Sequence, residues 1–359
     1  MPQHTPTSVL VTGGAGFIGS NFLLRMVPRH PGVRFVNLDL LTYAGNLLNL
    51  QAVEDAPNYA FVQGDIADAD LVGGLFAAHG FSTVVHFAAE SHVDRSILDP
   101  LAFVRTNVLG TATLLDAARQ AWLAEGPPGD VRFHHVSTDE VFGALAPGDP
   151  PFSEVTPYDP HSPYSASKAG SDHLARAYFD TYGLPVVVSN CSNNYGPYQF
   201  PEKLVPLIIA RAAALEPLPV YGKGENVRDW LHVEDHAAAI ERILFAGETG
   251  ETYCVGGGAE RRNLEVVETL CDLVDEALGR PAGTARAGIT FVTDRPGHDF
   301  RYAMDFSKLE RELGWRPAHS FEDGMRDTVR WYLEHRDWLD AVMDASYRDY
   351  YERQYGGRG

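Results

Sequence analysis

The chain has 359 residues, 45% of them hydrophobic, which is enough for a large α/β domain and a smaller second one. Its 48 acidic residues against 29 Lys and Arg residues give a formal net charge of −19, which argues against a nucleic-acid partner because phosphate backbones require a basic surface. The three cysteines are an odd number in a long chain and indicate reduced thiols of a cytoplasmic protein. No signal peptide or membrane span is visible, so no membrane partner is expected.

The first turn of the chain predicts a site for a dinucleotide. An apolar run at 8–11 reads as a buried strand, and residues 17–26 read as the helix that follows. Gly13 and Gly16 lie between the two, and Gly19 lies in the first turn of the helix. Such glycines permit a sharp turn and a close approach of the backbone to a pyrophosphate at the helix N-terminus. The alternative is a glycine-rich turn without a ligand. A second apolar run at 35–38 ends in Asp39, at the offset where such units place an acid on the adenosine ribose, and this order favours dinucleotide binding.

Strands and helices then continue to alternate. Strands are expected at 59–62, 83–88, 131–136 and 185–189, and helices at 71–78, at about 100–124 and from Tyr164 onward. This order predicts an α/β fold, a Rossmann-type doubly wound parallel sheet with helices on both faces.

The second part of the chain has a different texture. Helices at 204–215, 234–245, 263–278 and 321–332 are separated by short loops rich in Gly, Pro and charge. We expect residues 1–190 to form the cofactor domain, rejoined by about 231–256. Residues 191–230 and 257–345 would form a smaller mixed α/β substrate-binding domain, with a tail at 346–359.

A tyrosine and a lysine at helical spacing are the first candidates for catalysis. Tyr164 and Lys168 lie four residues apart and therefore share one face of a helix. A lysine ammonium beside a phenol would lower its pKa and make the tyrosine a usable base. Surface packing is the ordinary fate of such a pair. The Ser137-Thr138 turn favours catalysis, because its hydroxyls follow a strand at the edge where open α/β sheets bind ligands.

Together these features resemble the extended short-chain dehydrogenase/reductase family. Segments at 88–97, 137–143, 164–168, 190–197 and 294–299 are similar to those of the dTDP-glucose 4,6-dehydratases within it, and the similarity runs from about residue 8 to residue 332. Phe142 departs from the pattern, since the family often has tyrosine there. The resemblance implies an NAD-dependent enzyme (a hydro-lyase) that acts on dTDP-glucose, a nucleotide sugar. It also implies a homodimer held by a four-helix bundle. No metal site is expected, because no Cys, His and acid spacing resembles one and hydride chemistry needs no metal.

The adjacent acids Asp139 and Glu140 distinguish a dehydratase from related enzymes that share the fold. Loss of water across two carbons needs a base and an acid, and two close carboxyl groups can divide these roles because their repulsion favours one staying protonated. Neighbouring residues on a strand point to opposite faces, so the strand must end at about Ser137 for both acids to reach one pocket. A solvated, turn-forming acid pair is the alternative.

The resemblance implies a mechanism residue by residue. Tyr164, aided by Lys168 and Thr138, removes the proton of the 4-hydroxyl while hydride passes from carbon 4 to NAD. Glu140 then takes the proton of carbon 5 and Asp139 protonates the departing hydroxyl of carbon 6. NADH returns its hydride to carbon 6, so the cofactor must stay bound through the cycle.

The resemblance also implies two sets of binding residues. For NAD these are Gly13, Gly16, Phe17, Ile18, Gly19, Asp39, Leu40, Thr42, Asp65, Ile66, Ala88, Ala89, Ser91, Thr106, Tyr164, Lys168 and Asn194. For the nucleotide sugar they are His92, Thr138, Asn193, Lys203, Leu204, Pro219, Tyr221, Arg228, Asn263, Asp294, Arg295 and His298. Arg228 and Arg295 are the favoured diphosphate ligands, because a guanidinium can pair with two phosphate oxygens.

The family dimer would pair the helices at 101–124 and 164–182 of two subunits. The first of these carries apolar residues at roughly helical period, and that stripe could equally pack on the protein's own sheet. The stripe consists of Leu101, Val104, Val108, Leu115 and Ala118.

Two other functions remain open from the sequence. A nucleotide-sugar 4-epimerase shares the fold, the cofactor and the Tyr–Lys pair but has no need for the acid pair. A non-catalytic NAD-sensing regulator would have little reason to keep the catalytic residues together.

Overall fold

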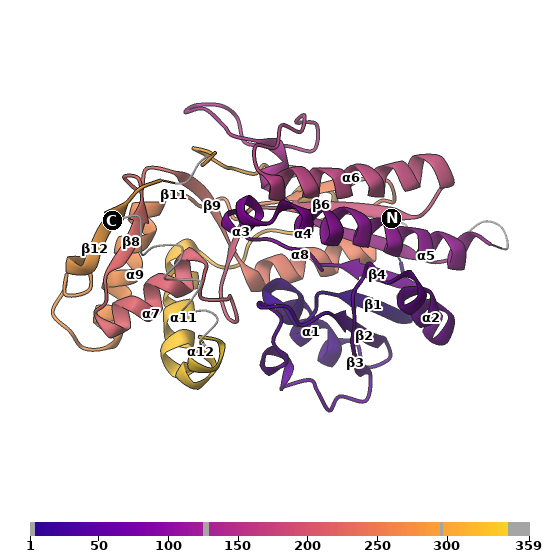
Figure 1. The fold of residues 1–359 in the computed structure, drawn as a ribbon, viewed down its shortest axis with the longest axis horizontal. Helices are drawn as coiled ribbons and strands as arrows, with labels where there is room; N and C mark the ends of the chain where they lie inside the picture. The colour runs from indigo at the N-terminus through magenta and orange to yellow at the C-terminus, as the bar shows by residue number, and fades with distance from the viewer. Residues whose placement is uncertain (1–3, 125–128, 295–296, 344–359) are drawn as a thin grey trace.

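The computed structural model describes residues 4–124, 129–294 and 297–343, and its largest element is a seven-stranded sheet (Figure 1). The strand order is β10-β6-β5-β4-β1-β2-β3, and every neighbouring pair is parallel. The strands are β1 (Ser8–Thr12), β2 (Arg34–Asp39), β3 (Tyr59–Gln63), β4 (Thr83–His86), β5 (Arg132–Thr138), β6 (Val186–Cys191) and β10 (Thr252–Val255).

Helices cover both faces of this sheet. Successive apolar side chains of β1 point to opposite faces, so both faces must be covered. Val9 and Val11 contribute to the core under α1 (Phe17–Arg29) and α8 (Val233–Ala246). Leu10 contributes to the opposite core, under α2 (Ala69–His79), α5 (Thr111–Leu123) and α6 (Pro163–Tyr182). The predicted doubly wound, Rossmann-type fold is therefore confirmed. The predicted boundaries are less accurate, since β4 ends two residues earlier than expected and β6 two residues later.

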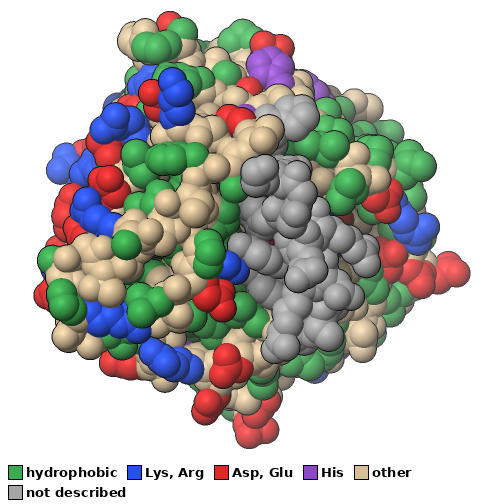
Figure 2. All heavy atoms as spheres, turned by 60° about the vertical axis from the view of Figure 1, so that its left-hand side comes forward, with side chains coloured by type: hydrophobic (Ala, Val, Ile, Leu, Met, Phe, Trp, Pro, Cys, Tyr) green, Lys and Arg blue, Asp and Glu red, His purple; other side chains and the backbone are tan. Residues whose placement is uncertain are grey.

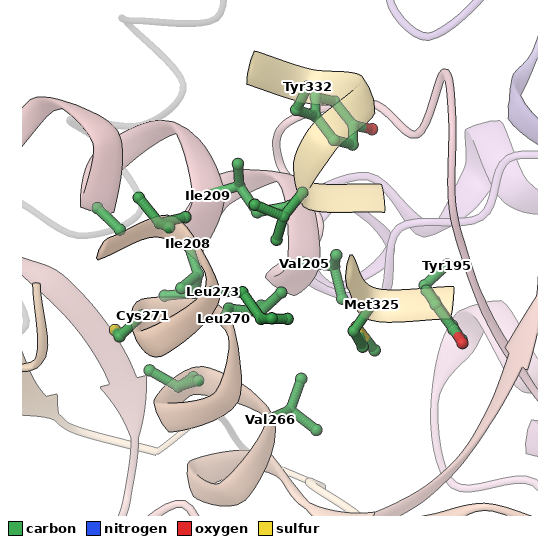
Figure 3. Close-up of a cluster of buried hydrophobic side chains, with 14 of the residues drawn as sticks. Tyr195, Val205, Ile208, Ile209, Val266, Leu270, Cys271, Leu273, Met325 and Tyr332 are labelled. Carbon is green, nitrogen blue, oxygen red and sulfur yellow. The ribbon is translucent and has the colours of Figure 1, made fainter. Parts of the chain in front are cut away.

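The second part of the chain has its own core (Figure 3). Helices α7 (Leu204–Ala214), α9 (Asn263–Ala277) and α11 (Phe321–Glu334) bury apolar side chains against one another, as Ile208, Leu270 and Met325 illustrate. Two small sheets flank them, β11-β9-β7 and β12-β8. Their strands are β7 (Asn193–Tyr195), β8 (Leu218–Tyr221), β9 (Val227–His232), β11 (Glu260–Arg262) and β12 (Ile289–Val292), and α10 (Ser307–Leu313), η4 (Arg286–Gly288) and α12 (Arg336–Val342) complete this part.

The expected single helix at about 100–124 is divided. A short helix, α4 (Pro100–Phe103), passes into a π-helical segment, η2 (Val104–Gly110), and only then into α5. Because a π-helical turn is wider than an α-helical one, apolar residues before and after it do not share one face. Leu101 is 75% exposed, whereas Leu115 and Ala118 are buried against the sheet. The predicted continuous apolar stripe was wrong.

The segment after β9 returns to the first sheet. β10 pairs with β6, and α8 packs beside α1. An ionic cluster fixes the second contact: Glu241 on α8 accepts hydrogen bonds from Arg25 Nε at 2.6 Å and His30 Nε2 at 3.0 Å. Burial alone would raise the pKa of Glu241, but these donors outweigh it and lower that pKa below its ordinary value.

Glu241→Gln is therefore expected to lower the free energy of unfolding by about 1 kcal/mol at pH 7. A carboxyl group whose pKa is lowered by folding stabilises the protein above its unfolded pKa, near 4.5, and that stabilisation is lost as the pH falls through the folded pKa. The wild type and the variant should thus converge at acidic pH in urea titrations. Glu276→Gln, which removes an exposed partner of Arg326, is the control and should change stability little at any pH.

The C-terminal helix of the described chain reaches back to the first part. Trp338 Nε1 on α12 donates a hydrogen bond to Asn49 Oδ1 at 2.8 Å, in η1 (Leu47–Leu50). The side-chain amide of Asn49 donates in turn to the carbonyl oxygen of Ala15 at 2.9 Å. The glycine turn after β1 is thereby linked to a helix more than 300 residues away.

Charges of both signs are mixed on one face of the molecule. On the face shown in Figure 2, Lys and Arg side chains lie scattered among Asp and Glu side chains. Within the described residues, no helix is long and apolar enough to cross a membrane.

Candidate active site

A large cavity lies at the carboxyl ends of the parallel strands. Its lining includes Gly13 after β1, Asp39 at the end of β2, Ala88 after β4, Thr138 at the end of β5 and Cys191 at the end of β6. This edge is where open α/β sheets bind their ligands.

The glycine turn is closely packed against the next strand. Gly13 has a φ of +72°, and a Cβ built on it would lie 2.6 Å from the backbone of Ala88. A Cβ on Gly19 would lie 2.3 Å from the carbonyl oxygen of Gly13. Both positions therefore exclude any larger residue.

The start of α1 fits an anionic ligand. Gly16 is its N-cap and offers no side-chain hydrogen bond, and the first turn contains no acidic residue. Phe17 and Ile18 of the same turn line the cavity. Free backbone N–H groups at the positive end of a helix dipole suit the pyrophosphate of NAD, so the observed turn fits the cofactor predicted from the sequence.

Asp39 holds the turn in shape. Its two carboxylate oxygens accept hydrogen bonds from the backbone N–H of Ala15, at 2.9 Å, and of Leu41, at 2.8 Å. Burial raises the pKa of Asp39, and these two hydrogen bonds oppose that rise. Asp39 thus combines the capping role left open from the sequence with a place in the cavity wall.

Every residue predicted to contact NAD lies in this cavity wall. Beyond those already described, the wall contains Leu40, Thr42, Asp65, Ile66, Ala89, Ser91, Thr106, Tyr164, Lys168 and Asn194.

The five predicted catalytic residues line the same cavity, because β5 ends in a tight turn. Thr138 is the last residue of β5, and Asp139 and Glu140 open the 3-10 helix η3 (Asp139–Phe142). The Thr138 hydroxyl accepts the backbone N–H of Glu140 at 3.2 Å and so caps this turn. Helical geometry replaces strand alternation here, which allows both acids to reach one cavity. The strand ends one residue later than the sequence required.

Asp139 has the environment of a general acid. Burial raises its pKa well above the ordinary value, and the adjacent Glu140 raises it further, whereas Arg228 opposes the rise. The shift favours the protonated form of Asp139, which is the form a general acid needs. Its Oδ2 atom is buried and forms no hydrogen bond with the described residues.

Tyr164 and Lys168 occupy successive turns of α6, which begins at Pro163 with a capping box from Ser162. Burial, followed by Glu140, raises the pKa of Tyr164 well above its ordinary value. Lys168 donates to the carbonyl oxygen of Val136 at 2.9 Å, and burial lowers its own pKa. The expected lowering of the Tyr164 pKa is thus absent from this structure, since burial dominates.

The predicted substrate residues divide into two groups. Thr138, Asn193 and Lys203 line the cavity, and the Oδ1 atom of Asn193 is buried without a hydrogen-bond partner among the described residues. The others lie outside that lining, except Arg295, which falls outside the described residues. They are His92, Leu204, Pro219, Tyr221, Arg228, Asn263, Asp294 and His298.

Several of these outer residues contact one another in the second part of the chain, and one of them also contacts Asp94 in the first part. Tyr221 donates to Asp94 Oδ2 at 3.2 Å, and its ring packs edge-on against His298. His298 in turn pairs with Asp294 at 2.6 Å. Asn263 carries a buried Oδ1 atom with no hydrogen-bond partner in the described chain.

Arg228 supports a backbone loop. Its guanidinium donates to the carbonyl oxygens of Val227, Asp299 and Phe300 and stacks over the ring of Tyr302, 4.2 Å from its centroid. The guanidinium also acts on Asp139 electrostatically. Arg228 thus holds this loop and acts to lower the pKa of Asp139, and its role toward phosphate stays a prediction.

The sequence reasoning missed other parts of the cavity wall. Glu90, Cys191, Phe200 and Glu202 line it. Glu90 and Cys191 lie within the segments 88–97 and 190–197 that carry the family resemblance, and Glu202 directly precedes the predicted substrate residue Lys203.

One group of side chains outside the cavity has ligand types that metals accept. Atoms of His232, Glu234 and His319 lie within 4.8 Å of one another. The two imidazole rings stack with centroids 4.1 Å apart, and His319 pairs with Asp235 at 3.1 Å. The sequence spacing did not suggest this group.

Comparisons with known proteins agree with this geometry. Residues 10–328 match the family model described as GDP-mannose 4,6 dehydratase. A dTDP-glucose 4,6-dehydratase of Xanthomonas campestris pv. campestris (strain B100) is 58% identical over 342 residues, which cover 94% of this chain and 97% of that protein. The corresponding protein of Shigella flexneri is 52% identical over 360 residues, covering 98% and 99%. The chain belongs to the dTDP-glucose 4,6-dehydratase family.

Solved structures support the same family. The dTDP-glucose 4,6-dehydratase of Streptomyces venezuelae with NAD and TYD bound has a TM-score of 0.84 at 47% identity and covers 94% of this chain and 100% of its own. The UDP-glucose 4-epimerase of Thermus thermophilus, in complex with NAD, has a TM-score of 0.80 at 32% identity and covers 92% and 100%. The dehydratase family thus shares its fold with epimerases, and the difference lies in the site.

Proposed function

We propose that this protein is an NAD-dependent dTDP-glucose 4,6-dehydratase, which forms dTDP-4-keto-6-deoxy-glucose. The observation that carries the proposal is the pair Asp139 and Glu140, placed by η3 in the same cavity as Tyr164 and Lys168. A 4-epimerase needs only the second pair. The high identity to curated dehydratases supports the same choice.

The cofactor site is built by the first sheet. The N-terminus of α1 would hold the pyrophosphate, Asp39 the adenosine ribose, and Tyr164 and Lys168 the nicotinamide end. The chemistry that NAD supplies when bound is the removal of a hydride from carbon 4 and its return to carbon 6. Asp39 would repel a 2′-phosphate, which favours NAD over NADP.

Proton movements belong to the protein. Tyr164 takes the proton of the 4-hydroxyl, and Lys168 stabilises the resulting phenolate; the Thr138 hydroxyl also favours the phenolate, because it acts to lower the pKa of Tyr164. The 4-ketone acidifies the proton on carbon 5, which Glu140 removes and gives back to carbon 5 when carbon 6 receives the hydride. Asp139, whose protonated form is favoured by burial, delivers its proton to the leaving hydroxyl of carbon 6. Two carboxyl groups thereby perform opposite tasks in one cavity.

A direct assay tests this function. The purified protein, freed of copurified nucleotide, is incubated with dTDP-glucose or with UDP-glucose, with NAD or NADP added. Both products are identified by mass spectrometry and by NMR, because a 4-epimer has the same mass as its substrate. We expect loss of one water from dTDP-glucose, a product with absorbance in alkali, and support by NAD alone. Conversion to a 4-epimer without loss of water would favour the epimerase, and no conversion would favour the regulator.

We further propose a homodimer. Exposed apolar side chains gather just before and within η2, at Leu98, Leu101, Val104 and Leu109, and η2 packs beside α6. Contiguous apolar surface of this kind is typical of an interface. The paired helices of two subunits would bury it in the four-helix bundle implied by the family resemblance.

Leu101→Glu is expected to shift the protein from dimer to monomer, because it places a charge on this apolar surface. Sedimentation velocity at micromolar concentration measures the shift. Val155→Glu is the matched control, since Val155 is 89% exposed in a loop. A wild type that sediments as a monomer would contradict the dimer.

The division into domains is also a proposal. Residues 1–190, with about 231–256, would form the NAD-binding domain, and 191–230 with 257–345 the nucleotide-sugar-binding domain. The pairing of β10 with β6 and the separate core around α7, α9 and α11 support this division. The proposed tail at 346–359 and residues 344–345 lie outside the described residues. Three free, buried cysteines support a reducing compartment such as the cytoplasm.

A further inference from the structure

A cluster of side chains around the buried Glu202 joins three segments of the cavity wall. Tyr43 lies in the segment that follows Asp39, Arg95 lies on α3 (Val93–Leu98), and Glu202 lies in the loop before α7. The first two segments belong to the part of the chain that carries the glycine turn. The third leads into the second part of the chain.

The contacts within this cluster are mutual. Tyr43 donates its hydroxyl hydrogen to Glu202 Oε1 at 2.9 Å, and Arg95 Nε donates to Glu202 Oε2 at 3.1 Å. The Arg95 guanidinium also stacks on the ring of Tyr43, with its central carbon 3.6 Å from the ring centroid. Phe200 packs edge-on against the same ring, at 5.6 Å between ring centroids. Each of the three residues therefore holds the other two.

Burial makes these contacts strong. The Glu202 side chain is 1% exposed and that of Arg95 is 27% exposed. A charge pair in such a place loses much when one partner is removed, because the remaining charge is left buried. Both carboxylate oxygens of Glu202 are engaged by protein donors, which indicates a connection between segments rather than a ligand site.

The three joined segments enclose the cavity proposed to hold NAD. Thr42, Ala44 and Gly45 flank Tyr43 in its wall, Glu90 and Ser91 precede α3, and Glu202 itself belongs to the wall. A second contact joins the same segments, from Lys203 Nζ to the carbonyl oxygen of Ser91 at 3.1 Å. The wall on this side cannot open without breaking the cluster.

We propose that Tyr43, Arg95 and Glu202 form a clamp that keeps the dinucleotide bound between the two hydride transfers. The inference rests on the proposed function, since only a cofactor that is reduced and reoxidised within one cycle must be retained. The three are positioning residues, because they act on the wall and not on the reacting atoms. The clamp should control the rate of cofactor escape while leaving the catalytic groups in place.

Three conservative variants test the clamp. Tyr43→Phe removes one hydroxyl, Glu202→Gln removes the charge that faces Arg95, and Arg95→Lys removes the stacked guanidinium. Tyr253→Phe is the matched control. Tyr253 is a buried tyrosine of β10, outside the cavity wall, whose hydroxyl accepts one backbone hydrogen bond.

The readout is cofactor exchange in the absence of substrate. We measure the NAD that copurifies with each protein and its rate of exchange with isotopically labelled NAD, with thermal unfolding recorded alongside. We expect the clamp variants to release NAD at least about tenfold faster than the wild type and the control. Added NAD should restore kcat to near the wild-type value, with a raised KM for NAD, and ultrafiltration during turnover should find free NADH.

The clamp is overturned if Tyr43→Phe, the mildest variant, remains folded and releases NAD as slowly as Tyr253→Phe. It is also overturned if saturating NAD fails to restore kcat in Glu202→Gln, because the residue would then act on the chemistry. The double variant Tyr43→Phe/Glu202→Gln should be less impaired than the product of the single effects, since one cluster is lost. Exchange is measured without dTDP-glucose, so failure of the proposed dehydration is a separate outcome.

Discussion

Glu140→Gln is expected to slow dehydration of dTDP-glucose by about 10²–10⁴-fold, the usual contribution of a positioned general base. The substitution keeps the size of the side chain and removes only the group that takes the proton of carbon 5. Tyr164 and Lys168 remain able to support oxidation at carbon 4. Single-turnover stopped flow should therefore still record absorbance of reduced nicotinamide on mixing, and this signal should persist because the next step is blocked.

Glu154→Gln is the control for this experiment. Glu154 is a partly buried acid that lies outside the cavity wall and accepts a hydrogen bond from the backbone of Cys254. The Glu154→Gln variant should dehydrate the substrate at a rate close to that of the wild type. A near-normal rate in the Glu140 variant would remove the role assigned to the acid pair and favour the epimerase.

Tyr164→Phe should suppress the first absorbance change itself, by about 10²–10⁴-fold in rate, since no group would take the 4-hydroxyl proton. The two variants therefore block successive steps of one reaction and differ in whether reduced nicotinamide forms. Burial and Glu140 both raise the pKa of Tyr164, so proton removal in the wild type should be faster at alkaline pH.

Tyr158→Phe separates this effect from a loss of stability. Tyr158 is another partly buried tyrosine, and its hydroxyl donates to Asp172 on α6 at 2.8 Å, outside the cavity wall. Its loss should affect unfolding more than the absorbance change. If Tyr164→Phe oxidises the substrate as fast as this control, the tyrosine is not the base.

The sequence was most informative where local chemistry determines local structure. Alternation of apolar runs and glycines predicted the parallel sheet, and the motif segments predicted residues that the fold brings to a single cavity. Gly13 illustrates why: its turn tolerates no side chain, so the residue type itself reports the geometry.

Contacts between distant segments could not be predicted in this way. The division of the helix at 100–124 depends on a π-helical segment, for which the apolar period gave no sign. The pKa of Asp139 depends on burial, and burial depends on packing of the whole chain. Likewise, Arg228 donates hydrogen bonds to a loop about 70 residues away, and its charge alone did not predict these contacts.

The bond chain from Trp338 through Asn49 to Ala15 also limits how such proteins can be recombined. A chimera that joins the first part of this chain to the second part of a relative would contain the glycine turn but not Trp338, whose indole donates to Asn49. An exchange of the whole second part of the chain, made to change the sugar preference, would therefore also weaken the cofactor site. Exchanges that preserve the cofactor site should therefore transfer residues 49 and 338 together.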